Sequence, residues 1–309
     1  MSSSIKELRN ATAIGMAAIL LAPGTPQARE SALIPDRTPG IDLPVTREHR
    51  YTMSGRVRML LLWIGRDDVG SGVIRWRGSE KGSAYELLIG SDPLRAPARL
   101  NRWGYLAEEI RGEECAVVGL ISKSDEQRLK DVAPGGPADS RFKSLRSRVT
   151  EERAYASVST VQTPTSSTYR EADAVLKLAL GDASSSIDQI KRPAGVRSGF
   201  LSSVAEIITL TVHQATTSQT IGRRQIQYVY GDKVYQLTLL EAATLPRFET
   251  DGRIFPNVIR ARFETGLPGA GSRSRFELVY GTAGELSGVP IVISYQPKWW
   301  LHVDLVIES

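Results

Sequence analysis

Apolar and polar residues alternate most regularly over the last twenty residues of the chain. Every second residue is apolar over 289–295 and again over 299–307, and Gln296-Pro297-Lys298 interrupts the alternation. A period of two with β-branched and aromatic residues is typical of strands, and a proline-containing break is typical of a turn. The pattern predicts a β-hairpin with one apolar face in a core. The residues expected on the opposite face of the last strand are Trp300, His302 and Asp304.

Similar strand-like segments recur from Tyr51 onwards. Gly231-Asp232 is typical of a two-residue hairpin turn, because the backbone there needs positive φ. Asp67-Asp68, followed by two glycines, predicts another turn, between an apolar strand over 57–64 and a strand over 73–76. The other expected strands are 85–89, 105–110, 114–121, 142–149, 154–161, 225–230, 233–240, 257–265 and 275–280.

Two segments show helical signals instead. Thr168 and Glu171 fit a capping box, and the apolar run that follows them ends at a glycine. A second apolar pattern with helical spacing begins near Phe200. We therefore expect helices near 168–180 and 200–212, each covering a sheet face or an open end of the sheet.

Together these elements predict a mainly β fold of the α+β class. A sheet of roughly a dozen strands generally curls or splits into layers. We expect one large antiparallel sheet, curled as an open barrel or arranged in two layers, with the two helices covering it. The β-rich domain is expected over 51–309, and the composition, 41% hydrophobic and 24% charged, is ordinary for a globular protein.

The first fifty residues lack the strand pattern. Lys6 and Arg9 precede an apolar run of about a dozen residues over 11–22, whereas a bilayer span needs about 18 or more. This arrangement predicts a secretory signal peptide over 1–28, with an uncleaved anchor or a buried helix as the alternative. Residues 29–50 contain three prolines and predict an extended linker. The mature protein is then expected in the periplasm or outside the cell.

The chain carries a formal net charge of +5, and most of its basic residues are arginine. Several arginines fall on the polar side of the last strands, which indicates either a solvated outer face or a surface for anionic envelope components. A nucleic-acid partner is not expected, because the aromatic residues of these strands lie on the opposite side. The arginines concerned are Arg224, Arg260, Arg262, Arg273 and Arg275.

Motifs that identify enzyme classes are absent from the sequence, including G-x-S-x-G, the P-loop, H-E-x-x-H and the dinucleotide-binding glycine pattern. Cys115 is the single cysteine, so an intramolecular disulfide and a Cys-based metal site are excluded. We expect no metal and no cofactor, and we assign no catalytic residue. His302 and Asp304 share a strand face and, with Trp300, form an alternative site, although a solvated strand face explains the pair as well.

The loop over 92–104, between the strands expected over 85–89 and 105–110, has the composition of a ligand site. Trp103 can stack on an amphipathic or sugar-like ligand while Asn101, Arg102 and Asp92 hold polar groups. The alternative is structural: Trp103 fills one end of a barrel, and Asp92 caps the turn at Pro93. Both interpretations stay open at this point.

The segment W-I-G-R-D-D-V-G-S-G over 63–72, the expected signal peptide, and the many strands with few helices carry a resemblance. In these features the chain resembles the uncharacterised periplasmic open-β-barrel proteins of Gram-negative bacteria, which are similar to lipoprotein carriers. The resemblance is architectural and covers roughly 51–307. It implies a cavity for an acyl chain or another amphipathic envelope component, and it assigns no residue.

The expected function is therefore non-enzymatic: binding or carrying an amphipathic or anionic ligand of the cell envelope, a lipid or a glycan, with peripheral membrane contact. The first alternative is a structural or assembly protein of the envelope. The second is a hydrolase of unknown substrate that uses Asp92 or the pair His302 and Asp304. A large apolar cavity would favour the carrier function. An exposed apolar patch would favour the structural protein, and convergent carboxylates in a cleft would favour the hydrolase.

Overall fold

A computed structural model describes residues 34–59, 62–97, 100–122, 141–163, 167–181, 186–217, 219–271, 273–298 and 301–309. The described strands form one antiparallel sheet in the order β8-β7-β6-β5-β4-β3-β2-β1-β14-β13-β12-β11-β10-β9. The expected mainly β fold with one large antiparallel sheet is confirmed. The expected signal peptide over 1–28 lies outside the described residues.

Strands that follow one another in the chain are neighbours in the sheet, with two exceptions: β8 and β9 lie at opposite edges, and the first strand also pairs with the last. One half contains β1 (Val45–Met59), β2 (Leu62–Ser79), β3 (Gly82–Ser91), β4 (Trp103–Arg111), β5 (Glu114–Ser122), β6 (Arg141–Val149), β7 (Arg153–Gln162) and β8 (Asp188–Lys191). The other half contains β9 (Arg224–Tyr230), β10 (Lys233–Thr250), β11 (Arg253–Gly266), β12 (Ser274–Gly281), β13 (Pro290–Lys298) and β14 (Leu301–Ile307). The helices are α1 (Ala172–Gly181) and α2 (Phe200–Thr216), with short 3₁₀ turns η3 (Tyr169–Glu171) and η4 (Gly284–Leu286).

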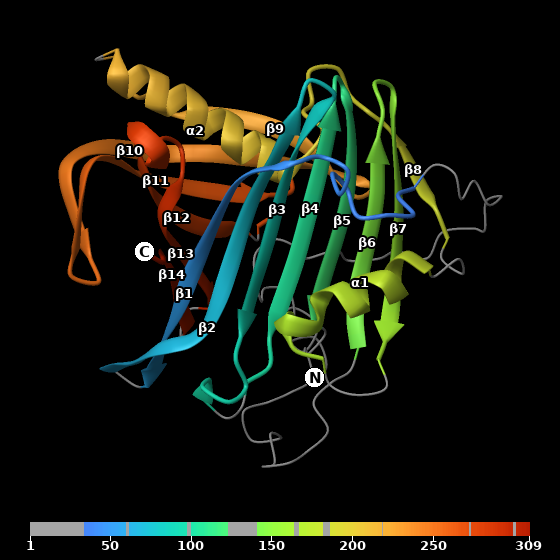
Figure 1. Ribbon diagram of the computed structural model, residues 1–309. Helices are drawn as coiled ribbons and strands as arrows, with labels where there is room; N and C mark the ends of the chain where they lie inside the picture. The colour runs from blue at the N-terminus through green and yellow to red at the C-terminus, as the bar shows by residue number, and fades with distance from the viewer. Residues whose placement is uncertain are drawn as a thin grey trace, which may run out of the picture.

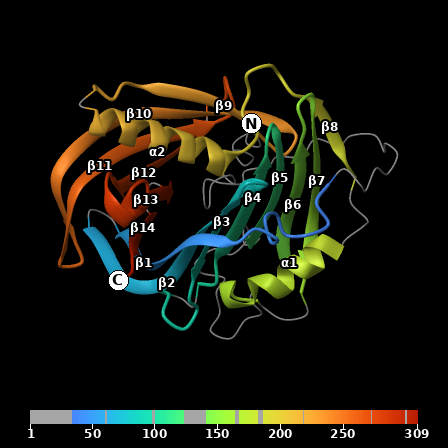
Figure 2. The same ribbon diagram turned by 45° about the horizontal axis from the view of Figure 1, so that its top comes forward.

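The sheet curls so that its two halves face each other (Figure 1; Figure 2). Side chains from the inner face of β4–β7 and from β9–β12 share one buried core, which includes Leu106, Leu145 and Tyr230. The edge strands β8 and β9 are not paired with each other, so the barrel stays open. Between them, Arg197 forms a parallel bridge to Tyr228 of β9. The connecting segment thus covers part of one sheet edge.

The two helices lie on different sides of the sheet (Figure 1). The apolar face of α1, with Val175 and Ala179, belongs to a core that covers the outer face of β4–β7. Ile207 and Ile208 of α2 enter the core between the two halves. Both predicted helices are confirmed, as is the capping box before α1, and α2 extends four residues beyond its expected end at 212.

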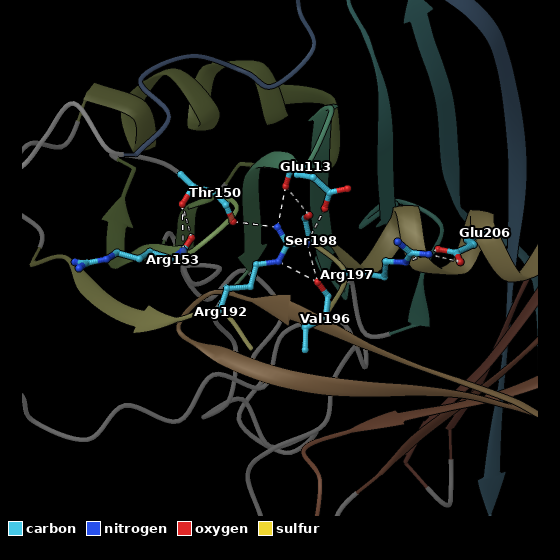
Figure 3. Close-up of polar contacts among 8 residues, drawn as sticks. All are labelled: Glu113, Thr150, Arg153, Arg192, Val196, Arg197, Ser198 and Glu206. Atoms are coloured by element: carbon cyan, nitrogen blue, oxygen red, sulfur yellow. Dashed lines mark hydrogen bonds and ion pairs between the residues drawn. The ribbon is translucent and has the colours of Figure 1, made fainter. Parts of the chain in front are cut away.

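An arginine with a largely buried side chain connects three turns at the end of the sheet where β8 leads to α2 (Figure 3). Arg192 is 7% exposed and donates to the carbonyls of Glu113 (2.9 Å), Thr150 (3.0 Å) and Val196 (2.8 and 2.9 Å). Glu113 also accepts from Arg192 through its carboxylate, at 3.2 Å. One guanidinium therefore holds the β4–β5 turn, the β6–β7 turn and the segment before α2 together.

The predicted C-terminal hairpin is confirmed, and Leu305 and Ile307 are buried as expected. The turn predicted at 296–298 is wrong, because β13 continues to Lys298 and the proline-containing break is a register shift within the strand. The opposite face of β14 is less exposed than the alternation predicts, because Asp304 and Val306 are also buried. Val306 lies beside Val292 of β13, so this face of the sheet carries apolar contacts of its own.

The turn predicted at Asp67-Asp68 is wrong. β2 runs without interruption from Leu62 to Ser79, and its pairing with β1 shifts register where Gly55 meets Arg66 and Met53 meets Gly70. Asp68 has a φ of 53° at this shift. Asp tolerates this left-handed conformation and glycine allows close backbone approach, so the same residues form a bulge as readily as a turn.

Two other boundaries differ from the sequence expectation. β1 begins at Val45, inside the segment expected as a linker over 29–50. β10 and β11 extend far beyond 233–240 and 257–265, and they meet in a turn at Asp251 and Gly252, which both have positive φ. The long arm formed in this way contributes Phe255 to the core beside β13 and β14.

Candidate functional site

Asp92 caps the turn that follows β3. Its carboxylate accepts the backbone N–H of Leu94 at 3.0 Å, and it forms ion pairs with Arg95 at 3.1 Å and Arg170 at 2.9 Å. These contacts, with the Leu94 hydrogen bond first among them, hold the pKa of Asp92 below its usual value although burial opposes this. The carboxylate is thus occupied by the protein itself.

Trp103, expected to stack on a ligand, is fully buried. Its ring lies 4.8 Å from that of Phe142, and its indole N–H donates to the carbonyl of Ser167 at 2.9 Å. The Asn101 amide donates to the same carbonyl at 3.0 Å, and Arg102 is also engaged in a polar contact. The structure brings the four expected residues into one region, but the indole has no face open to a ligand.

His302 and Asp304, from the alternative site, do interact, whereas Trp300 lies outside the described residues. The Asp304 Oδ1 is 3.0 Å from His302 Nε2 and accepts from Ser294 Oγ at 2.6 Å, while Arg56 lies 3.2 Å from Oδ2. Burial opposes ionisation of Asp304. The hydrogen bonds from His302 and Ser294 and the charge of Arg56 outweigh it and keep the pKa of Asp304 below its usual value.

The order of these contacts bears on the hydrolase alternative. Nucleophilic catalysis by serine needs a base that contacts the hydroxyl and a carboxylate that orients the base. Here Asp304 contacts both Ser294 and His302, so the carboxylate stands between the hydroxyl and the imidazole. This arrangement stabilises an ion pair with Arg56 across β14 and β1 and does not activate the hydroxyl.

An apolar pocket lies on the inner face of the sheet, across β3–β7. Two rows of paired residues form its floor, because the register places Leu87, Leu106 and Leu145 in one row and Ile89 and Ile121 in the next. Tyr230 borders the pocket from the opposite half of the sheet, and a Cβ placed on Gly119 would lie 3.1 Å from its hydroxyl. The enclosed volume is about 40 Å³.

Lys143 provides a positive charge beside this pocket. It follows Ile121 in the second row and is partly exposed. Its ammonium group forms no hydrogen bond or ion pair with the part of the chain that the structure describes. An apolar surface with one uncompensated cation is suited to a molecule with an apolar chain and an anionic group.

Sequence reasoning did not identify this pocket. The alternation in β4–β6 predicts which residues share a face, and Gly104, Gly119 and Lys143 do stand out on that face as small or charged. The signal could therefore have been found within each strand. The contribution of Tyr230 could not be predicted in this way, because Tyr230 lies on β9 and reaches the pocket only through the curl of the sheet.

The basic outer face expected on the last strands is largely neutralised. Arg260 and Arg262 pair with Glu277 at 2.7 and 3.3 Å, and Arg273 and Arg275 both pair with Glu264, at 2.7 and 2.9 Å. These cross-strand pairs make the face mixed in charge, which favours a solvated surface over a surface for anionic components.

Within the described residues, no group of three or more His, Cys, Asp or Glu side chains is placed to hold a metal ion. Cys115 is buried, and burial raises the pKa of its thiol well above the usual value. Among the described helices, none has the length and apolar character needed to cross a membrane.

Comparisons with known proteins add little to this geometry. No protein-family model matches the chain, and no curated protein matches its sequence. One solved structure, described as a "putative lipoprotein" from Parabacteroides distasonis ATCC 8503, aligns over 88% of this chain and 99% of its own, with 7% identity and a TM-score of 0.28. The resemblance is loose, and we draw no conclusion about function from it.

Proposed function

We propose that the protein binds an amphipathic molecule with an apolar chain and an anionic group on the inner face of β3–β7. The expected export signal would place this activity in the cell envelope, where acyl-chain lipids with anionic groups are available. The observation that carries the proposal is the position of Lys143, which has no ion pair within the described residues and borders an otherwise apolar pocket.

The small volume of the pocket limits the mode of binding. Enclosed small-molecule sites measure about 300 to 1,000 Å³, whereas the enclosed space here is about 40 Å³. A chain cannot be enclosed inside the barrel in this conformation. The apolar part of the ligand would instead lie along the rows of Leu87 and Ile89, with only its end in the enclosed space and its anionic group near Lys143.

This proposal uses other residues than those expected from the sequence. Trp103 and Asp92 lie near the same end of the sheet, but internal contacts occupy both side chains. Their role in the proposal is to fix the loop between β3 and β4. The ligand itself contacts the inner-face rows.

The test is a calorimetric titration of the full chain with a long-chain fatty acid, palmitate, below its micellar concentration. Lys143→Glu should weaken binding by at least about tenfold, because it replaces attraction of the carboxylate with repulsion. Ile121→Trp should also weaken it, by filling the pocket. Lys177→Glu on the exposed side of α1 makes the same charge change on the outer face, and it should leave binding unchanged.

Two results would overturn the proposal. One is the absence of binding up to about 1 mM, the weak end of specific affinity. The other is equal loss of affinity in the Lys143 and Lys177 variants, which would show a general charge effect. In either case the structural or assembly role becomes the better explanation of the fold.

A further inference from the structure

The paired ends of β1 and β2 project beyond β3 on one side, whereas on the other side β14 pairs with β1 as far as Val57. β3 ends at Ser91, which pairs with Gly70 of β2, while β1 and β2 continue to pair as far as Met59 and Leu62. At about 3.3 Å per residue, the ribbon extends roughly 20 to 25 Å past the end of β3. Figure 1 shows this ribbon leaving the body of the sheet beside β14.

This ribbon carries large apolar side chains on both faces. Trp63 is 45% exposed and Ile64 is 55% exposed. They are adjacent on a strand, so their side chains point to opposite faces. Among the large exposed hydrophobic residues of the described chain, they are the two that are neighbours in sequence.

The surrounding sequence continues this character. In the sequence, residues 59–62 are Met-Leu-Leu-Leu. Three arginines, Arg56, Arg58 and Arg66, occur within the same eleven residues as this apolar run. No acidic residue lies between them, although Asp67 and Asp68, which pairs with Arg95, follow Arg66 directly. Arg66 is exposed and forms no ion pair with the described part of the chain, while Arg56 pairs with Asp304 but stays 58% exposed.

We propose that the end of the β1–β2 ribbon docks on an anionic membrane surface. Trp63 and Ile64 would enter the boundary between headgroups and acyl chains, and Arg66 and Arg56 would contact lipid phosphates. A bilayer fits better than a protein partner, because a groove or sheet edge on a protein covers one face of a ribbon. A fluid lipid layer surrounds both faces, and the arginines favour its anionic headgroups.

The pocket lies at the same end of the sheet. Ile89, Ile121 and Lys143 are each within two residues of a strand end on the side where the ribbon projects. Docking would therefore bring the inner face of β3–β7 close to the bilayer. The docking proposal stands on the ribbon alone and does not depend on ligand binding in the pocket.

The test is co-sedimentation of the full chain with vesicles of phosphatidylcholine alone and of equal parts phosphatidylcholine and phosphatidylglycerol. We expect binding to the anionic vesicles that weakens as salt increases. The double variant Trp63→Ser with Ile64→Ser should bind at least about tenfold more weakly. Ile254→Ser is the matched control, because Ile254 is 54% exposed on the β10–β11 arm, and it should bind like the wild type.

A second pair of variants tests the charge. Arg66→Glu should weaken binding to anionic vesicles, and Arg223→Glu, an equal change at an exposed loop position, should not. Binding that is unchanged in the double variant would overturn the proposal, as would failure of the wild type to bind either vesicle. If the wild type instead forms a dimer that the double variant loses, a second copy covers the ribbon and the proposal is also wrong. Palmitate titration of the double variant separates the two proposals, since it should bind normally.

Discussion

The carboxylate of Glu108 on β4 accepts a hydrogen bond of 2.8 Å from the backbone N–H of Phe200, the first residue of α2, 92 positions further along the chain. It also accepts from the N–H groups of Leu201 at 2.9 Å and Ser202 at 3.1 Å. The residue before the helix is Gly199, which has no side chain to serve as a cap. Burial raises the pKa of Glu108, and the three N–H groups oppose that shift. A side chain from the sheet thus caps α2.

Replacing Glu108 by Ala should lower the free energy of unfolding by about 3 kcal/mol, because it leaves one buried and two partly buried N–H groups without an acceptor. Urea denaturation measures this. Glu108→Gln keeps one acceptor and should cost less. Glu114→Ala, at an exposed carboxylate on β5, should stay within about 0.5 kcal/mol of the wild type.

Gly199→Ala offers an independent check of the same contact. A methyl group there would clash with the Glu108 Oε2, so it should displace the carboxylate and reproduce part of the loss. Wild-type stability in both Glu108→Ala and Gly199→Ala would show that the cap contributes nothing.

Asp92 gives a prediction for acidic pH. Its pKa is lower in the folded protein than in the unfolded chain, where it is about 3.9. The stability that its ionisation provides is therefore complete above about pH 4 and is lost as pH falls through the lower folded value. Asp92→Asn should be about 1 kcal/mol less stable at pH 7, a modest figure because Arg95 and Arg170 are partly exposed. The difference in unfolding free energy between the wild type and the Asp92→Asn variant should become smaller below pH 4.

The measurement is the free energy of unfolding of both proteins from pH 7 down to about pH 3, over the part of this range in which both proteins are folded without denaturant. Other carboxylates titrate in the same range, but they do so in both proteins and cancel in the difference. A gap that stays constant over this range would mean that the charge of Asp92 does not stabilise the fold.

Arg192→Lys tests the hydrogen bonds by which Arg192 connects the three turns. A lysine keeps the charge but cannot reach the carbonyls of Glu113, Thr150 and Val196 in the fixed geometry of a guanidinium. We expect a loss of about 2 kcal/mol in unfolding free energy. The matched change is Arg197→Lys, because Arg197 is 54% exposed and pairs with Glu206, and it should cost under about 0.5 kcal/mol. Equal effects of the two changes would show that the hydrogen bonds of Arg192 to the three turns do not stabilise the fold.

The strands and helices of this fold were largely predictable from local patterns. The period-two alternation of β14, the Gly231-Asp232 turn and the capping box at Thr168 each depend on residues close in sequence. The segment at Asp67-Asp68 shows the limit of such reasoning. A bulge and a turn both use residues that tolerate positive φ, and only the partner strand decides between them.

The candidate sites were harder to predict, because they depend on contacts between residues far apart in the sequence. Trp103 has the composition of a ligand-binding residue, yet the carbonyl of Ser167 and the ring of Phe142 bury it. The role of Glu108 was equally hard to predict, because in the sequence it is only one of two adjacent acidic residues. Its role follows from the position of α2, which no local pattern specifies.

The pairing of β1 with β14 affects how the protein can fold. All other strand pairs join neighbours in the chain, so each half can form by closing short loops. Tyr51 and Ile307 can pair only after the entire chain between them is available, and beside this pair the N–H of Glu308 donates to the carbonyl of Arg50 at 2.7 Å. During synthesis, β1 therefore lacks its β14 partner until the chain has been made as far as Ile307. Until then β1 presents an unpaired edge at the centre of what becomes the sheet, where a chaperone could bind it.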